Sequence, residues 1–355
     1  MHEASRSGLV TLDELRIADT DLCVSDGRER FAHELIVPFV RDVDAGAAVR
    51  PIVPTAAARS SWAAKFARGV RLPGSEWVYA KLYASPRGIQ AMLCQDVAKL
   101  VTRLRKECDV KDWFFFRYPD PDWHLRLRVR APGRAQQEHV RRLIEATCRR
   151  LRRQQSLWRL EYDTYFREIE RFGGSRGCVN VERLFTVESE LALCAFDAWG
   201  DSETGSSQAM SLAIAWTWWV WLCLGLTPLD VAAVARALRS GLVRERLITR
   251  QQTRACRVDR DEPLRVPDGD WRAFTVRAGR ILGRLRRSTD TRDLGVDRRE
   301  LAGDLSHLFV NRLFQARHEE CEFGLYGALE RHAHKAVVDG AANRGRPPTA
   351  GTGPR

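Results

Sequence analysis

The sequence predicts an α+β fold, with a ferredoxin-like antiparallel sheet and its helices followed by a mostly helical half. The strongest observation is the run WFFFRYPDPDWHLRLRVR at 113–130, where two apolar segments flank a Pro-Asp-Pro-Asp turn signal. Strand patterns at 77–84 and 157–166, each separated from this hairpin by a helical pattern, complete the series. The order strand–helix–strand–strand–helix–strand is that of a split β-α-β unit, which gives a ferredoxin-like sheet.

The remainder of the chain carries helical patterns. The start signal Thr227-Pro228-Leu229-Asp230 predicts a helix that ends at Gly241. The segment 210–226 has seventeen uncharged residues. A transmembrane helix needs about 20, so we expect a buried helix instead. Further helices are expected, in addition to the one at 135–153 in the first half, at 180–199, 269–287, 298–318 and 320–338.

Composition divides the chain into three parts. Residues 1–70 are weakly patterned, with short strands expected around an Asp-Gly turn at 26–27, and are predicted to be an N-terminal extension and linker. Residues 71–339 contain the strong patterns and form the predicted domain. Residues 340–355 are rich in Gly and Pro, which predicts a disordered tail.

Charge and cysteine usage limit the class of protein. The formal net charge of +12 permits non-specific binding to nucleic acid, but no nucleic-acid motif accompanies it, which favours a solvated basic surface. The nine cysteines include no C-x-x-C pair, which excludes the usual zinc fingers and argues against a disulfide framework. The N-terminal residues lack the apolar segment of a signal peptide. We therefore expect a cytoplasmic protein without a membrane span.

One strand face of the predicted hairpin is unusually basic. His124, Arg126 and Arg128 alternate with apolar residues and therefore share a face. Like charges side by side repel one another unless an anionic group lies between them, so this face is predicted to be either open to solvent or the floor of an anion site. The alternative is that the arginines pair with Glu168 and Glu170 across the sheet.

Two further clusters could carry chemistry. Arg171 precedes a Gly-Gly turn in the run REIERFGG, where it could also simply cover the turn. His307 and Asn311 are four residues apart on one predicted helix face, with Arg312 beside them. His307 could be a buried core histidine and Asn311 could only bridge helices. The sequence contains no P-loop, no G-x-S-x-G and no H-E-x-x-H, so we expect neither a metal nor a cofactor.

Four of these segments together carry a resemblance to a known family. The runs WVYAKLYASPRG, WFFFRYPDPDWHLRLRVR, DTYFREIERFGG and SHLFVNRLF occur in that order. Over roughly 75–338 the chain resembles the C-terminal glutamate-elimination domain of lantibiotic dehydratases, which also occurs as a stand-alone protein in thiopeptide-type bacteriocin biosynthesis. The resemblance implies that glutamate is removed from glutamylated Ser or Thr residues of a precursor peptide, which leaves dehydroalanine or dehydrobutyrine.

The resemblance also implies which residues act. It carries over to Arg126, Arg128, Arg171 and His307 as the catalytic residues of a lyase. Arginines remain charged and can hold the glutamyl carboxylates and a developing oxyanion, whereas histidine can take or return a proton. We expect additional contacts to the substrate from four neighbours, namely Arg117, His124, Asn311 and Arg312.

The expected partners follow from the same resemblance. Full-length family members carry a large glutamylation domain where this chain has about seventy residues. The expectation is therefore a stand-alone elimination component that needs a separate glutamyl-tRNA-dependent glutamylating protein. Its substrate would be a ribosomally made precursor peptide with a leader and a Ser/Thr-rich core, and the chain could form a homodimer.

Two other functions remain open. Some stand-alone relatives are [4+2] cyclases that form the central pyridine of thiopeptides from two dehydroalanines. The presence of Arg126, Arg128, Arg171 and His307 favours elimination over cyclisation. The other alternative is a non-catalytic module whose basic groove binds the precursor peptide or a tRNA.

Overall fold

The computed structural model describes residues 69–199, 203–245, 247–249, 252, 271–290 and 296–344, together with two short strands nearer the N-terminus. The chain divides into two compact units, 1–60 and 61–355. In the first unit, β1 (Val24–Ser25) pairs antiparallel with β2 (Arg30–Phe31), as expected for short strands there. The Asp-Gly turn predicted between them lies outside the described residues.

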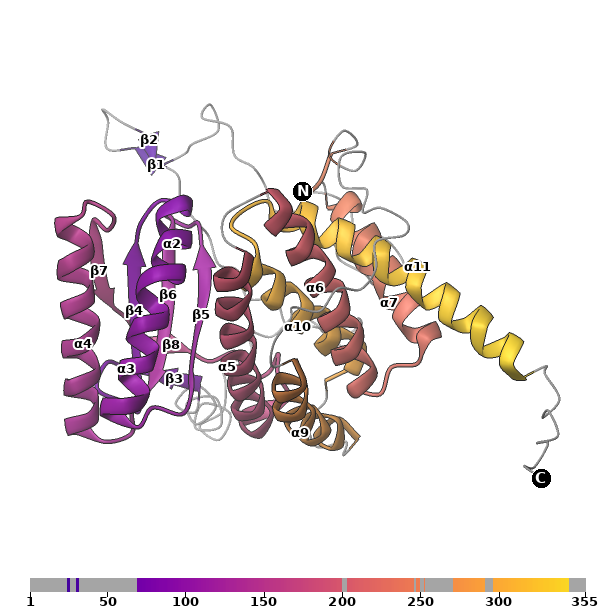
Figure 1. Ribbon diagram of the computed structural model, residues 1–355, viewed down its shortest axis with the longest axis horizontal. Coiled ribbons are helices and arrows are strands. Elements are labelled where there is room, and N and C mark those ends of the chain that lie inside the picture. The colour runs from indigo at the N-terminus through magenta and orange to yellow at the C-terminus, as the bar shows by residue number, and fades with distance from the viewer. Residues whose placement is uncertain are drawn as a thin grey trace, which may run out of the picture. The chain divides into compact units, whose positions relative to one another are not determined.

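The second unit contains a four-stranded antiparallel sheet. Its strands are β4 (Trp77–Tyr83), β5 (Trp113–Tyr118), β6 (His124–Arg130) and β7 (Arg159–Tyr162), in the order β5-β6-β4-β7 (Figure 1). This is the strand order of a ferredoxin-like sheet, so the predicted fold class is confirmed. The register places Phe116 opposite Arg126 and Phe114 opposite Arg128, so these aromatic rings and guanidinium groups share one face.

Helices connect these strands. Ser85 caps α2 (Pro86–Met92) by accepting a hydrogen bond from the backbone N–H of Gly88 at 3.1 Å. A π-helical turn, η2 (Leu93–Val97), leads into α3 (Ala98–Cys108). The second connection is α4 (Arg134–Arg153), which buries an apolar stripe and has arginines on its outer side. The predicted helix at 135–153 is therefore confirmed.

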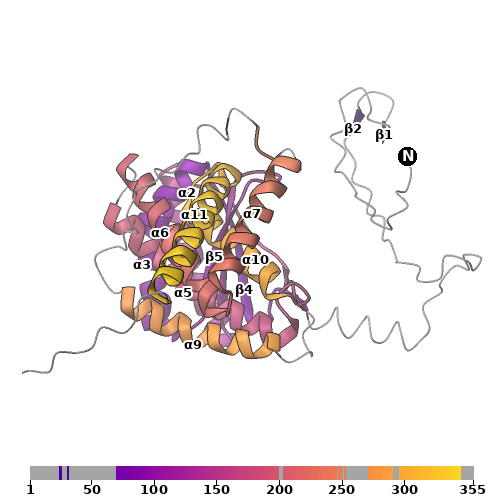
Figure 2. The same ribbon diagram turned by 90° about the vertical axis from the view of Figure 1, so that its right-hand side faces the viewer.

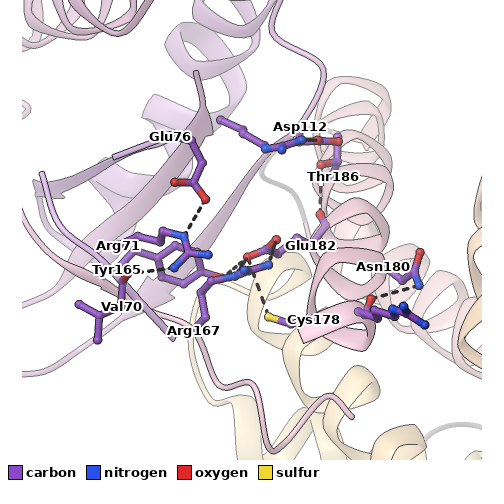
Figure 3. Close-up of polar contacts among 12 residues, drawn as sticks. Val70, Arg71, Glu76, Asp112, Tyr165, Arg167, Cys178, Asn180, Glu182 and Thr186 are labelled. Carbon is purple, nitrogen blue, oxygen red and sulfur yellow. Dashed lines mark hydrogen bonds and ion pairs between the residues drawn. The ribbon is translucent and has the colours of Figure 1, made fainter. Parts of the chain in front are cut away.

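The strand predicted at 157–166 is wrong in its second half. It breaks after β7, and the following strand β8 (Tyr165–Phe166) pairs instead with β3 (Val70–Arg71). At the break, the carboxylate of Asp163 accepts a hydrogen bond from the backbone N–H of Thr164 at 2.6 Å. Beyond it, Tyr165 and Arg167 both donate to the buried carboxylate of Glu182, which draws the chain toward the helices (Figure 3).

Six helices are described in the second half: α5 (Gly174–Trp199), α6 (Glu203–Cys223), α7 (Pro228–Arg244), α9 (Trp271–Asp290), α10 (Arg298–Leu313) and α11 (His318–Arg344). α7 packs along α11 (Figures 1 and 2). The mostly helical second half is thus confirmed.

Several helix boundaries differ from the predicted ones. α5 begins six residues early, at the Gly-Gly turn, and α7 extends beyond Gly241. α10 ends at Leu313 because Phe314 is extended. Residues 340–344, predicted to be part of a disordered tail, belong to α11, and residues 345–355 lie outside the described residues. The Thr227–Asp230 capping box predicted at the start of α7 is present.

The apolar segment at 210–226 forms most of a buried helix, α6. Trp216 and Trp221 are 1% and 0% exposed, and the indole N–H of Trp221 donates to the carbonyl of Ala302 at 2.8 Å. Among the described helices, none combines the length and the hydropathy that crossing a membrane requires.

Helices α5 and α10 cover the outer edge of the sheet. Alternate backbone N–H groups of β5 point outward, as in any edge strand. Those of Trp113 and Phe115 donate to the hydroxyls of Thr186 and Ser189 on α5, at 3.2 and 3.3 Å. Figure 1 shows α5 lying beside β5. The helical half is therefore fixed to the sheet through the edge strand, and residues from the two halves meet there.

Candidate active site

A pocket of about 210 Å³, here called the arginine pocket, is lined by residues of both halves of the domain. Its walls come from β5, β6, β8, the turn before α5, α5 itself and α10. All four predicted catalytic residues line it, together with two of the predicted substrate contacts: Arg117, Arg126, Arg128, Arg171, His307 and Asn311. The other two predicted contacts, His124 and Arg312, lie outside its lining.

Arg128 is the most deeply buried cation of the catalytic set. It is 8% exposed, and its guanidinium carbon lies 4.2 Å from the ring centroid of Tyr165 and 4.6 Å from that of Tyr79. Within the described part of the chain its side chain meets no hydrogen-bond acceptor, and its Nε is buried. Aromatic faces attract a cation but cannot replace hydrogen bonds. Such a side chain is suited to an anion that enters the pocket.

Arg126 is held by its neighbours on the strand. Its Nε donates to Nε2 of His124 at 3.1 Å, and its guanidinium carbon lies 3.3 Å from the ring centroid of Tyr118. Nδ1 of His124 lies 2.7 Å from the carbonyl oxygen of Asp122, which fits a donating Nδ1–H and a neutral ring. Burial lowers the pKa of His124, which favours the same neutral form. His124 therefore positions Arg126.

The alternative pairing of these arginines with Glu168 and Glu170 is not what the structure contains. Glu168 binds Arg171 instead, with Nη1 to Oε2 at 2.6 Å. Among the described residues, neither Arg126 nor Arg128 forms an ion pair with a carboxylate. Two cations thus share one strand face with no counter-ion from the described chain, as the anion-site prediction requires.

Arg171 is fixed by two carboxylates. Besides Glu168, it binds Asp304 of α10, with Nη2 to Oδ1 at 2.7 Å. The turn that follows depends on Gly173 and Gly174, whose φ angles of 75° and 79° disfavour other residues. Burial alone would lower the pKa of Arg171, but the bonds to Asp304 and Glu168 raise it, so Arg171 remains a cation.

His307 forms the wall opposite the sheet. Its Nδ1 lies 2.6 Å from Oε1 of the buried Glu322 on α11. The hydrogen bond to Glu322 raises the pKa of His307, and the charge of Arg171 opposes this shift. Because Nδ1 is engaged, Nε2 is the nitrogen left to exchange a proton with a bound molecule. His307 is exposed rather than a buried core histidine.

Sequence reasoning missed the two carboxylates that position Arg171 and His307, namely Asp304 and Glu322. Asp304 lies three residues before His307 on the same helix, so its spacing could have indicated a shared face. Glu322 lies on the next helix, within an acidic run at 319–322, and nothing in that run distinguishes it from its neighbours.

Two of the predicted substrate contacts have structural partners. Oδ1 of Asn311 accepts from the backbone N–H of Arg117, and its Nδ2 donates to the carbonyl of Arg117, both at 2.9 Å. Asn311 thus joins α10 to the edge strand, which corresponds to the bridging role left open for it. The side chain of Arg117 is 1% exposed and donates to Gln90 at 2.6 Å.

Arg312 is a fully buried cation. Its Nη1 lies 2.9 Å from Oε2 of Glu188, and its guanidinium carbon lies 4.2 Å from the ring centroid of Phe116 and 4.3 Å from that of Phe185. Burial lowers the pKa of Arg312 to about 10 and raises the pKa of Glu188 to about 7. The ring of Phe116 also lines the arginine pocket, so Arg312 supports one of the pocket's walls through this contact.

The arrangement defines what the pocket can do. Arg126 and Arg128 offer donors to an anion, and His307 offers a nitrogen that can exchange a proton. Within the described ranges no three His, Cys, Asp or Glu side chains are grouped as metal ligands. The fold and site together define a domain in which a ferredoxin-like sheet and a helical half enclose an arginine-lined, histidine-bearing pocket.

Comparison with known proteins identifies the family. The model of the family described as lantibiotic biosynthesis dehydratase C-term matches residues 77–333, and the chain belongs to this family. The subtilin biosynthesis protein SpaB of Bacillus subtilis is 23% identical over 173 residues, which are 49% of this chain and 16% of SpaB. The nisin biosynthesis protein NisB of Lactococcus lactis subsp. lactis is 26% identical over 171 residues, 47% of this chain and 16% of NisB.

A solved structure shows the same fold. The tRNA-dependent lantibiotic dehydratase MibB from Microbispora sp. 107891 matches with a TM-score of 0.56 and 23% identity, over 77% of this chain and 29% of that chain. This chain therefore matches less than a third of each of these three relatives.

Proposed function

We propose that this chain eliminates glutamate from glutamylated Ser or Thr residues of a ribosomal precursor peptide. The products are dehydroalanine or dehydrobutyrine and free glutamate. The observation that carries the proposal is the meeting of Arg126, Arg128, Arg171 and His307 in one pocket. Membership in the lantibiotic dehydratase C-terminal family supports it. The glutamylated peptide would be supplied by a separate, glutamyl-tRNA-dependent activity.

The reaction is a β-elimination from an ester. The Cα–H bond breaks and its proton passes to a base, while the electron pair forms the Cα–Cβ double bond. The Cβ–O bond breaks, and glutamate leaves with the electrons of that bond as a carboxylate. Negative charge develops on the adjacent amide oxygen during the proton transfer, so the site must hold an oxyanion as well as a leaving carboxylate.

Each residue has a role in this proposal. Arg126 and Arg128 bind the glutamyl carboxylate and the developing oxyanion, which restores the hydrogen bonds that Arg128 lacks. Nε2 of His307 takes the α-proton, and the carboxylate of Glu322 stabilises the resulting imidazolium. Arg171, held by Glu168 and Asp304, keeps the pKa of His307 from rising further.

A direct assay tests the proposal. A peptide bearing one O-glutamyl serine is incubated with the protein, and free glutamate and dehydroalanine are measured by mass spectrometry. His307→Ala should lower the rate by at least about a hundredfold, the usual contribution of a general base. Circular dichroism should show an unchanged fold, and thermal melting should remain cooperative. A fully active His307→Ala variant would contradict the assignment.

The same preparation separates the alternatives. A pyridine macrocycle and an expelled leader, formed from an already dehydrated peptide, would instead indicate a [4+2] cyclase. Binding of tRNA that weakens steeply with salt, without turnover of either peptide, would indicate a binding module.

A further inference from the structure

A second cavity adjoins the arginine pocket. It has a volume of about 530 Å³ and is lined by α7, α10 and α11; we call it the helical cavity. Arg171 and His307 line both cavities, so the two meet at the proposed proton-transfer residue. The proposed elimination places no part of the glutamyl group in the helical cavity, although it is the larger of the two.

The two cavities differ in charge. The charged residues that line only the arginine pocket are three arginines and Glu168. Those that line only the helical cavity are Arg244 and four carboxylates: Glu245, Glu300, Asp304 and Glu322. An apolar surface from Leu238 and Leu242 of α7 accompanies them. The helical cavity is therefore acidic, with an apolar wall.

The carboxylates differ in how far they are already engaged. Asp304 and Glu322 bind Arg171 and His307. Glu245 lies 3.5 Å from the exposed Arg244. Glu300 is exposed and has no ion pair with a described cation. Glu300 is thus the carboxylate most available to a bound group.

Size and position indicate what fits. A volume of about 530 Å³ lies within the range of roughly 300–1,000 Å³ that is usual for bound ligands, whereas the arginine pocket, at about 210 Å³, suits a single group. A peptide whose α-carbon is presented to His307 must continue away from it. The helical cavity provides space that begins at His307.

We propose that the helical cavity binds the peptide segment next to the modified residue and prefers neutral or basic side chains there. This inference rests on the proposed function, because it takes the arginine pocket as the glutamyl site. The apolar wall receives the side chain of one neighbouring residue, and Glu300 attracts a basic one and repels an acidic one.

Filling the helical cavity tests the binding of the segment. A Cβ on Gly241 would have Oε1 of Glu245 as its nearest heavy atom at 3.8 Å, so Gly241→Phe can place its ring in the cavity. We expect KM for a long glutamylated peptide to rise about tenfold, as for a lost apolar contact. KM for a capped, single-residue O-glutamyl serine should not change.

A matched control shows whether a Gly→Phe change in a helix by itself alters KM. Gly283 of α9 lines none of the described cavities, and its Cβ would meet only the flexible end of Arg287 at 3.7 Å. Gly283→Phe should leave both KM values unchanged. If Gly241→Phe changes KM for neither substrate, or changes both KM values equally, the inference is overturned.

The charge preference is tested independently by Glu300→Lys. Wild type should favour a peptide with Lys beside the glutamylated serine over one with Glu, in kcat/KM. In Glu300→Lys, the ratio of kcat/KM for the Lys peptide to that for the Glu peptide should fall about threefold, which corresponds to the energy of an exposed charge pair. An unchanged ratio overturns the preference.

A binding measurement distinguishes failure of this inference from failure of the proposed function. Fluorescence anisotropy with a labelled, unmodified peptide needs no turnover. Wild type could bind this peptide without eliminating glutamate, with Gly241→Phe weakening binding and Gly283→Phe leaving it unchanged. That result would support peptide binding in the helical cavity and contradict the proposed elimination. If Gly241→Phe does not weaken binding and turnover is absent, the helical cavity is overturned too.

Discussion

Arg128 illustrates how a single side chain can be arranged for a ligand. Leaving a buried donor without an acceptor costs about 1–3 kcal/mol, and more for a charged group. The rings of Tyr79 and Tyr165 return about 2 kcal/mol for each desolvated contact, but they supply no hydrogen-bond acceptor. A side chain that is 8% exposed and lacks an acceptor among the described residues is therefore stabilised best when an anion is bound.

At the same scale, Glu322 should set the pH dependence of His307. Glu322→Gln keeps an acceptor for Nδ1–H but removes the charge that raises the pKa of His307. The pKa should fall toward its ordinary value, so the limb of the pH profile of kcat/KM that reports His307 should move to lower pH. The sign is the same whether the neutral or the charged ring is the active form.

The control for this change is Glu319→Gln, an exposed acid on the same helix. It should leave the pH profile unchanged. Stability provides a second measurement. Because the folded-state pKa of His307 is raised, its pairing with Glu322 stabilises the fold below the ordinary histidine pKa and is lost as pH rises through the raised value. A limb that does not move in Glu322→Gln would contradict the role of Glu322.

At the scale of elements, the joint between α10 and β5 connects the proposed base to the arginines. α10 carries His307 and Asp304, and β5 pairs with the strand that carries Arg126 and Arg128. The amide of Asn311 bonds to both backbone groups of Arg117, as a neighbouring strand would. The helix is thereby held at a fixed register against the sheet.

Asn311→Leu should loosen this joint. The N–H and C=O of Arg117 would lose their partners, at about 1–3 kcal/mol each, so the free energy of unfolding should fall by roughly 2–6 kcal/mol in urea denaturation. kcat should also fall because His307 shifts relative to the arginines. Asn311→Asp keeps the acceptor and loses the donor, so its free energy of unfolding should lie between those of wild type and Asn311→Leu. Wild-type stability in Asn311→Leu would show that the joint does not depend on these bonds.

The sequence predicts elements whose signal is local. Alternation places Arg126 and Arg128 on one strand face, and Thr227 with Asp230 marks the start of α7. The break after β7 was missed because Glu182, which draws Tyr165 and Arg167 away, lies on a separate helix. The four proposed catalytic residues were identified from family motifs. Of the carboxylates that bind them, Asp304 could be found from its spacing to His307, whereas Glu322 could not, since no spacing relates one helix to the next.

At the scale of the whole molecule, a buried ion pair holds the helical half together behind the pocket. Arg312 of α10 binds Glu188 of α5, and the indole N–H of Trp216 on α6 donates to the same carboxylate at 3.1 Å. Three helices therefore converge on one charge pair whose members are 0% and 1% exposed. Phe116 and Phe185 lie against Arg312, so the pair also supports the sheet side of the pocket.

A double-mutant cycle on this pair should show strong coupling. Arg312→Met leaves Glu188 buried without a counter-charge, and the free energy of unfolding should fall by about 3–5 kcal/mol. Adding Glu188→Leu removes the stranded carboxylate and should recover most of that loss. The Arg312→Met penalty should grow as pH rises. Burial already raises the pKa of Glu188 to about 7, and a raised carboxylate pKa favours the fold only while the group is protonated. Urea denaturation at acidic and alkaline pH measures both effects, and additive losses would show that the pair is not a unit.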